Sequence, residues 1–217
     1  METRKKNLSR VLYGLRSINK ATREKSWKEI EKISEFEPSY LYRYRGYLRS
    51  LLWNKLQGVR EDAWSHLSIY KILSVDGIER SLSLSSDKLK ITAWLHVADM
   101  INLGILDKGD VIAMRDHFWK LLKSYYPTIR KKAWNLFPIL VKEGFFLEKD
   151  KNRFLEFLKN PKPSIRIKAW QKSILLLNMG FLSKEDIKNN IKYLNELLTK
   201  ESNIKKIAQN ILRGLNV

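Results

Sequence analysis

A pair of residues that could grip a phosphate backbone recurs along this sequence: a basic residue with a tryptophan four positions later. Arginine and lysine donate charge-assisted hydrogen bonds to phosphate, and an aromatic ring can stack on a base or sugar. The pair occurs five times, as Arg23–Trp27, Arg60–Trp64, Lys90–Trp94, Arg130–Trp134 and Arg166–Trp170. A worn sixth copy has Lys205 followed by Gln209. Residues four apart share one side of a helix. We call the six basic residues the cationic ladder.

The regular spacing of these pairs indicates an internal repeat. Successive tryptophans are 37, 30, 40 and 36 residues apart, and an alanine or serine precedes each. Between them lie segments with helical apolar spacing, such as Val111, Met114, Phe118 and Leu121. One motif at such a period is typical of a helical repeat array, in which each unit is a helical hairpin.

Three connections between the expected helices have the same form: "NLGILDKGD", "KEGFFLEKD" and "NMGFLSKED". In each, a glycine ends one helix, two apolar residues cover the junction, and a polar residue opens the next helix. The expected caps are Asp107, Glu148 and Ser183. The pattern predicts an all-α fold, a right-handed α-solenoid of about six helical hairpins, forming a single repeat domain over residues 1–217.

The stretch "PTIRKKAW", residues 127–134, and its copy at 163–170 resemble the second helix of a HEAT repeat. The resemblance extends over essentially the whole chain in period and pattern, and it implies a HEAT-like array. Such arrays serve as scaffolds, transport receptors and DNA-binding proteins. HEAT repeats often carry an aspartate about six residues before the arginine; here Asn54, Leu84, Ser124 and Asn160 stand there. We therefore expect the cationic ladder to lack acidic partners.

Charge points to a polyanionic partner. The chain has 42 basic and 23 acidic residues, a net charge of +19. Residues 1–110 hold 20 basic and 14 acidic residues, and residues 111–217 hold 22 and 9. Such an excess favours nucleic acid first and an anionic membrane or an acidic protein second, although a lysine-rich proteome would also produce basic chains. The absence of cysteine excludes disulfides and thiol catalysis. With neither a secretory signal nor a long apolar run, we expect a cytoplasmic protein without a membrane partner.

The second helices of a solenoid lie side by side at roughly 10 Å, so the ladder would form a basic row on the concave face. The predicted nucleic-acid-binding residues are Arg23, Arg60, Lys90, Arg130, Lys131, Arg166, Lys168 and Lys205. Their contacts would go to phosphates and so be largely independent of sequence. The alternative is that each arginine binds carbonyl or hydroxyl groups of the adjacent repeat and contacts no ligand. For the tryptophans, wedging between hairpins as core is favoured over stacking on bases.

The stretch "SYLYRYRGYLRS", residues 39–50, alternates tyrosine with arginine, as single-strand-binding proteins do. On one helix, however, Tyr40, Tyr44 and Tyr47 would share a stripe with Leu51, which predicts an amphipathic first helix instead.

Nothing in the sequence predicts a catalytic residue, a metal site or a cofactor. No glycine-rich phosphate loop is present, and His66, His96 and His117 lack metal-type partners. His66 and His96 are expected to be exposed on helices. DNA alkylation-repair glycosylases use HEAT-like arrays with a catalytic aspartate, and a distant resemblance to them would put Asp99 in that place. We therefore expect a non-enzymatic protein that binds DNA or structured RNA; the alternatives are a scaffold for an acidic protein and, less favoured, a glycosylase-like repair protein.

Overall fold

The computed structural model describes residues 2–200 and 202–215, with side chains for residues 7–200 and 203–215. Every regular element in these ranges is a helix, so the all-α class is confirmed. None of the described helices is both long and apolar enough to cross a membrane. The chain divides into two compact units, residues 1–114 and 115–217, each described by itself below. A single repeat domain over residues 1–217 stays a prediction.

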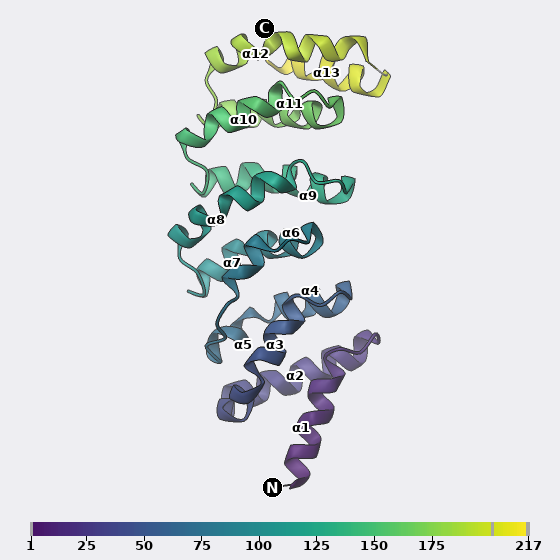
Figure 1. Ribbon diagram of the computed structural model, residues 1–217, viewed down its shortest axis with the longest axis vertical. Coiled ribbons are helices and arrows are strands. Elements are labelled where there is room, and N and C mark those ends of the chain that lie inside the picture. Colours follow the sequence, from purple (N-terminus) through teal and green to yellow (C-terminus); the bar gives the residue numbers. More distant parts are fainter. Residues whose placement is uncertain (1, 201, 216–217) are drawn as a thin grey trace. The chain divides into compact units, whose positions relative to one another are not determined.

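Unit 1 consists of helical hairpins in which several of the helices are interrupted by a break (Figure 1). Its helices are α1 (Glu2–Gly14), α2 (Lys20–Phe36), η1 (Pro38–Tyr44), α3 (Arg45–Leu52), α4 (Gln57–Ser65), α5 (Leu67–Ile72), η2 (Glu79–Ser83), α6 (Asp87–Leu95) and α7 (Val97–Asn102). The tryptophan-bearing helices α2 and α4 pack against each other. Helix α8 (Lys108–Leu121) begins in this unit and ends in the next.

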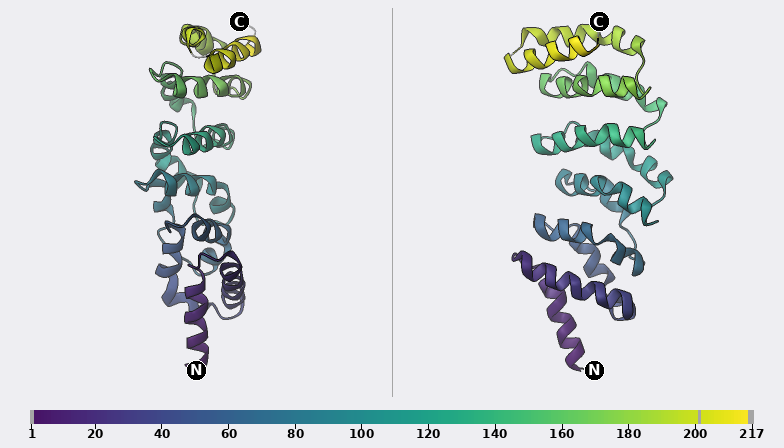
Figure 2. Two further views of the ribbon diagram at one scale, coloured as in Figure 1. Left: turned by 90° about the vertical axis from the view of Figure 1, so that its right-hand side faces the viewer. Right: turned by 180° about the vertical axis from the view of Figure 1, so that it is seen from behind.

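Unit 2 contains longer, uninterrupted second helices. After α8 come α9 (Pro127–Lys142), η3 (Glu148–Asp150), α10 (Lys151–Leu158), α11 (Pro163–Asn178), α12 (Lys184–Asn195), η4 (Glu196–Thr199) and α13 (Ser202–Leu215). Helix α11 packs between α9 and α13, and α10 packs on α12, so second helices neighbour second helices and first helices neighbour first helices (Figure 2). We call α9, α11 and α13 the second-helix layer of unit 2. Pro127 and Pro163 open their helices, as the repeated motif predicts.

The repeated tryptophans are core residues that lock each hairpin. All five are at most 1% exposed. In four of them the indole N–H donates to the carbonyl oxygen twelve residues earlier, at the end of the preceding first helix: Trp64 to Leu52, Trp94 to Leu82, Trp134 to Leu122 and Trp170 to Leu158, at 3.0–3.1 Å. This geometry confirms the core role expected of them and excludes their stacking on an external base.

The three similar connections end their helices as predicted. Gly104, Gly144 and Gly180 have φ of +63° to +74°, a region that favours glycine. After each of them, the next N–H bonds back to the carbonyl five residues earlier, as in a Schellman motif. Asp107 and Ser183 accept bonds from the first turns of α8 and α12. Glu148 is not a cap; the Asp150 carboxylate takes that part by accepting from the Leu147 N–H at 2.9 Å.

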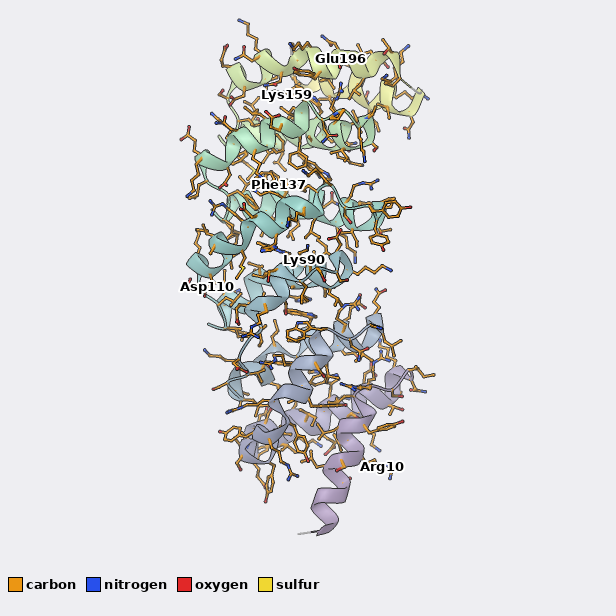
Figure 3. All side chains as sticks on the ribbon, viewed as in Figure 1. Arg10, Lys90, Asp110, Phe137, Lys159 and Glu196 are labelled. Atoms are coloured by element: carbon orange, nitrogen blue, oxygen red, sulfur yellow. The ribbon has the colours of Figure 1, made fainter. Side chains whose placement is uncertain are left out.

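An aromatic cluster fills the interior of unit 2. Phe137 of α9 stacks on Phe154 of α10, with ring centroids 5.5 Å apart, and points between the helices (Figure 3). Phe118, Trp119 and Phe146 pack around the same ring. This apolar contact holds the second-helix layer on the first helices.

Two expectations about unit 1 are wrong. His66 and His96 are not exposed on continuous helices: each sits at a break, between α4 and α5 or between α6 and α7, and is half-buried. Their rings stack on Trp27 and Trp64 of the preceding hairpin, at 4.4 and 5.4 Å.

The tyrosine–arginine stretch does not form one helix either. A 3-10 helix, η1, comes before α3, and the Arg45 guanidinium lies over the Tyr42 ring at 4.3 Å. The Arg45 side chain therefore contacts a tyrosine of the same stretch, within unit 1.

Candidate nucleic-acid interface

The cationic ladder divides into buried and accessible members. Arg23, Arg60, Lys90 and Arg166 are only 3–8% exposed. Arg130 is half-buried and Lys205 is exposed. Of the two other predicted binding residues, Lys131 is exposed and Lys168 is half-buried.

The ladder arginines share an internal hydrogen-bonding role. Each donates to the carbonyl six residues before it, in the loop that leads into its own helix: Arg23 to Ser17 (3.0 Å), Arg60 to Asn54 (2.6 Å), Arg130 to Ser124 (2.7 Å) and Arg166 to Asn160 (2.7 Å). Three of them also reach the carbonyl five residues before. At this position of the repeat a backbone carbonyl, rather than a side-chain carboxylate, accepts from the guanidinium. We call this arrangement the arginine clamp.

The expectation that the ladder lacks acidic partners is wrong for three members. The Arg23 guanidinium pairs with Asp62 of the next hairpin. Lys90 pairs with Asp87 at 3.4 Å, and Arg166 pairs with Glu196 at 2.6 Å. A charge this deeply buried must be paired or fully hydrogen-bonded, because its desolvation is otherwise too costly. The positive charges of these three residues are therefore paired with acidic residues of the protein itself.

Arg130 differs from Arg23 and Arg60 in the residue type at one position of the repeat that follows it. In unit 1, the position two residues before the next tryptophan supplies an acceptor: Asp62 for Arg23, and Thr92 for Arg60 at 3.4 Å. The corresponding residue after Arg130 is Lys168. A second cation cannot neutralise the guanidinium, and none of the ion pairs among the described residues involves Arg130 or Lys168. Both charges therefore contribute to a positive surface.

The second-helix layer of unit 2 carries no acidic residue. Helix α9 has four basic residues, α11 has three and α13 has three. Nine of these ten reach solvent at least in part: Arg130, Lys131, Lys132, Lys142, Lys168, Lys172, Lys205, Lys206 and Arg213. The tryptophan helices of unit 1 are mixed instead: α2 has five basic and four acidic residues, and α4 has one and two. The accessible basic surface is thus built by residues other than the four buried members of the ladder.

The pKa of the Lys172 amine is lowered, in part by the positive charge of this layer. Burial lowers the pKa of its amine, and the neighbouring charge of Lys168 lowers that pKa further. The Lys172 ammonium donates to the Asn135 side chain across α9 and α11 at 3.0 Å. An anion placed here would relieve the mutual repulsion of the two lysines.

The remaining candidates for a site, Asp99 and a groove, both lie in unit 1. Asp99 lies in the first turn of α7, where its carboxylate contacts the His96 ring at 2.8 Å. Within the described ranges, no group of three histidine or acidic side chains is placed to hold a metal ion. A groove of about 700 Å³ lies at the start of unit 1, between α1, α2 and η1, and its charged lining includes both Glu29 and Lys32. It lacks the single sign of charge that the second-helix layer shows.

Comparison with known proteins gives no family. No protein-family model matches the chain, and no curated protein matches it. Among solved structures, it is similar to an engineered protein that was a structural genomics target, with 16% sequence identity and a TM-score of 0.43, over 97% of this chain and 96% of that one. A likeness of this degree carries no argument about family or activity. The HEAT-like resemblance stays a prediction from the repeated sequence motif.

Proposed function

We propose that this chain is a non-enzymatic HEAT-like α-solenoid that binds DNA or structured RNA through the second-helix layer of unit 2. The observation that carries the proposal is the exclusively basic composition of α9, α11 and α13, with nine accessible cations. Contacts from lysine and arginine to phosphate oxygens carry no sequence information, so binding through such contacts would be largely independent of sequence. A cytoplasmic setting stays a prediction.

The phosphate contacts are assigned to the accessible cations of this layer. Of the predicted binding residues, Arg130, Lys131, Lys168 and Lys205 are kept, and Lys132 is added to them. Arg23, Arg60, Lys90 and Arg166 instead support the fold, because they are buried as well as bound to protein oxygens.

Charge reversal at one exposed pair tests this assignment. We expect Lys131→Glu/Lys132→Glu to weaken binding to a random-sequence duplex at least tenfold, and to make the slope of log K against log[salt] shallower by about two, since two phosphate contacts are lost. The matched control is Lys25→Glu/Lys28→Glu, which reverses two exposed lysines on α2 of unit 1. Fluorescence anisotropy measures both. Equal losses in the two variants would argue for a diffuse charge effect and against this site.

A second candidate function is the binding of an acidic amphipathic protein segment. Ile139 of α9 and Leu175 of α11 are 56% and 48% exposed and occupy equivalent positions, five residues after each tryptophan. Exposed apolar residues among lysines fit a helix with one acidic and one apolar face. The double variant Ile139→Ser/Leu175→Ser should weaken the binding of such a partner and leave duplex binding unchanged. This difference separates the two functions.

A further inference from the structure

The loop before α9, residues 122–126, presents two tyrosine rings at the surface. The Tyr125 side chain is 88% exposed and Tyr126 is 42% exposed. Their rings lie perpendicular to each other, with centroids 5.6 Å apart. A large aromatic surface left in water favours contact with a partner, since its burial would release apolar area.

The arginine clamp holds the backbone that carries these rings. The Arg130 guanidinium donates to the carbonyls of Ser124 at 2.7 Å and Tyr125 at 2.9 Å. On the other side, Pro127 opens α9 with a restricted φ. A loop that is already ordered loses little conformational entropy when it binds. The clamp therefore prepares the tyrosines for contact.

Packing within the protein does not account for Tyr125. An apolar residue just before a helix N-cap often packs back onto the helix as a hydrophobic staple, and Tyr125 precedes the N-cap residue Tyr126. A stapled ring would be covered, whereas this one is 88% exposed. In the equivalent loop of unit 1, Ile18 is also 88% exposed, but an aliphatic side chain cannot stack on a base.

The charged residues that flank the loop in the sequence are all basic. Residues 120–142 contain six basic and no acidic residues. Lys123 in the loop, and Lys131 and Lys132 on the first turns of α9, are exposed. Aromatic rings beside lysines that bind phosphate are the combination by which proteins hold single-stranded nucleic acid.

We infer that Tyr125, supported by Tyr126, is a stacking site for an unpaired base, and that the preferred ligand contains a single-stranded segment. This inference rests on the proposed function, because the lysines of α9 must hold the phosphates that flank the base. It adds that affinity rises where a base is free to leave its stack, while base identity matters little.

Two oligonucleotides with the same number of phosphates, one single-stranded and one duplex, test the inference by fluorescence anisotropy. Tyr125→Ala should weaken single-strand binding about tenfold, the loss of one stacked base, and should leave duplex binding within twofold of wild type. Tyr125→Phe should keep the affinity, since it keeps the ring. Tyr13→Ala is the matched control, because Tyr13 on α1 is 84% exposed and should not affect binding.

The outcomes separate the inference from the proposed function. If Tyr125→Ala binds the single strand as tightly as wild type, while both proteins bind duplex with strong salt dependence, the stacking site is wrong and the proposed function stands. Equal losses on both oligonucleotides would also overturn stacking and assign the loop to backbone contacts. If neither oligonucleotide binds even at low salt, the proposed function fails and the stacking site fails with it.

Discussion

At the scale of single residues, burial decides what an arginine can do. Arg166 is 8% exposed and donates to the Asn160 and Tyr193 carbonyls and to Glu196. Lys131, on the neighbouring α9, is exposed. The sequence places both in the same repeated motif, yet the first supports the fold and the second is free to meet an anion.

This contrast predicts opposite effects for two substitutions that remove one charge each. Arg166→Met should lower the free energy of unfolding by about 1–3 kcal/mol, because several oxygens lose a charged donor. Lys131→Met should leave stability unchanged. Urea unfolding measures the stability of both variants.

Duplex binding should show the reverse order. Lys131→Met should bind more weakly than wild type, and folded Arg166→Met should bind like wild type. A stable Arg166→Met protein with reduced binding would put the guanidinium back in the interface.

At the scale of elements, the repeat motif predicts helix starts well and contacts between repeats poorly. Pro127 and Pro163 mark the starts of α9 and α11, and the three glycine connections form as expected, because these signals are local. The breaks at His66 and His96 are not local: each ring stacks on a tryptophan 39 or 32 residues earlier. The arginine clamp could not be predicted from the sequence for a different reason. Its acceptors are backbone carbonyls, which every residue type carries.

The start of α12 gives a prediction about pH. Burial raises the pKa of Asp186, but hydrogen bonds from the Ser183 N–H and hydroxyl, and the charge of Lys151 on α10, outweigh it and hold that pKa below its usual value. A lowered folded-state pKa means that the ionised carboxylate stabilises the fold above its unfolded pKa of about 3.9. This contribution is lost as pH falls through the folded pKa.

Asp186→Asn should therefore lower the free energy of unfolding by about 1 kcal/mol at pH 6, the usual value of a helix cap. The difference from wild type should shrink steadily below pH 4, as the wild-type carboxyl group takes up a proton. Urea unfolding at pH 6 and pH 3 measures it. A difference that stayed constant between the two pH values would show that the ionised carboxylate contributes nothing.

At the scale of the whole molecule, the sequence predicts the charge excess but not which residues display it. Residues 111–217 hold 22 basic and 9 acidic residues. Among the described residues of unit 2, the acidic ones lie outside the second helices, as with Asp150 before α10 and Asp186 on α12. Knowing which helices pack as one layer was needed to see that α9, α11 and α13 present only positive charge.

The salt dependence of binding to a random-sequence duplex tests the central claim most directly. If the second-helix layer of unit 2 engages about five phosphates, log K should fall linearly against log[salt] with a slope of roughly −4.5, with little preference among sequences. A slope near zero, or no measurable affinity at low salt, would contradict the claim that this layer binds a nucleic-acid backbone.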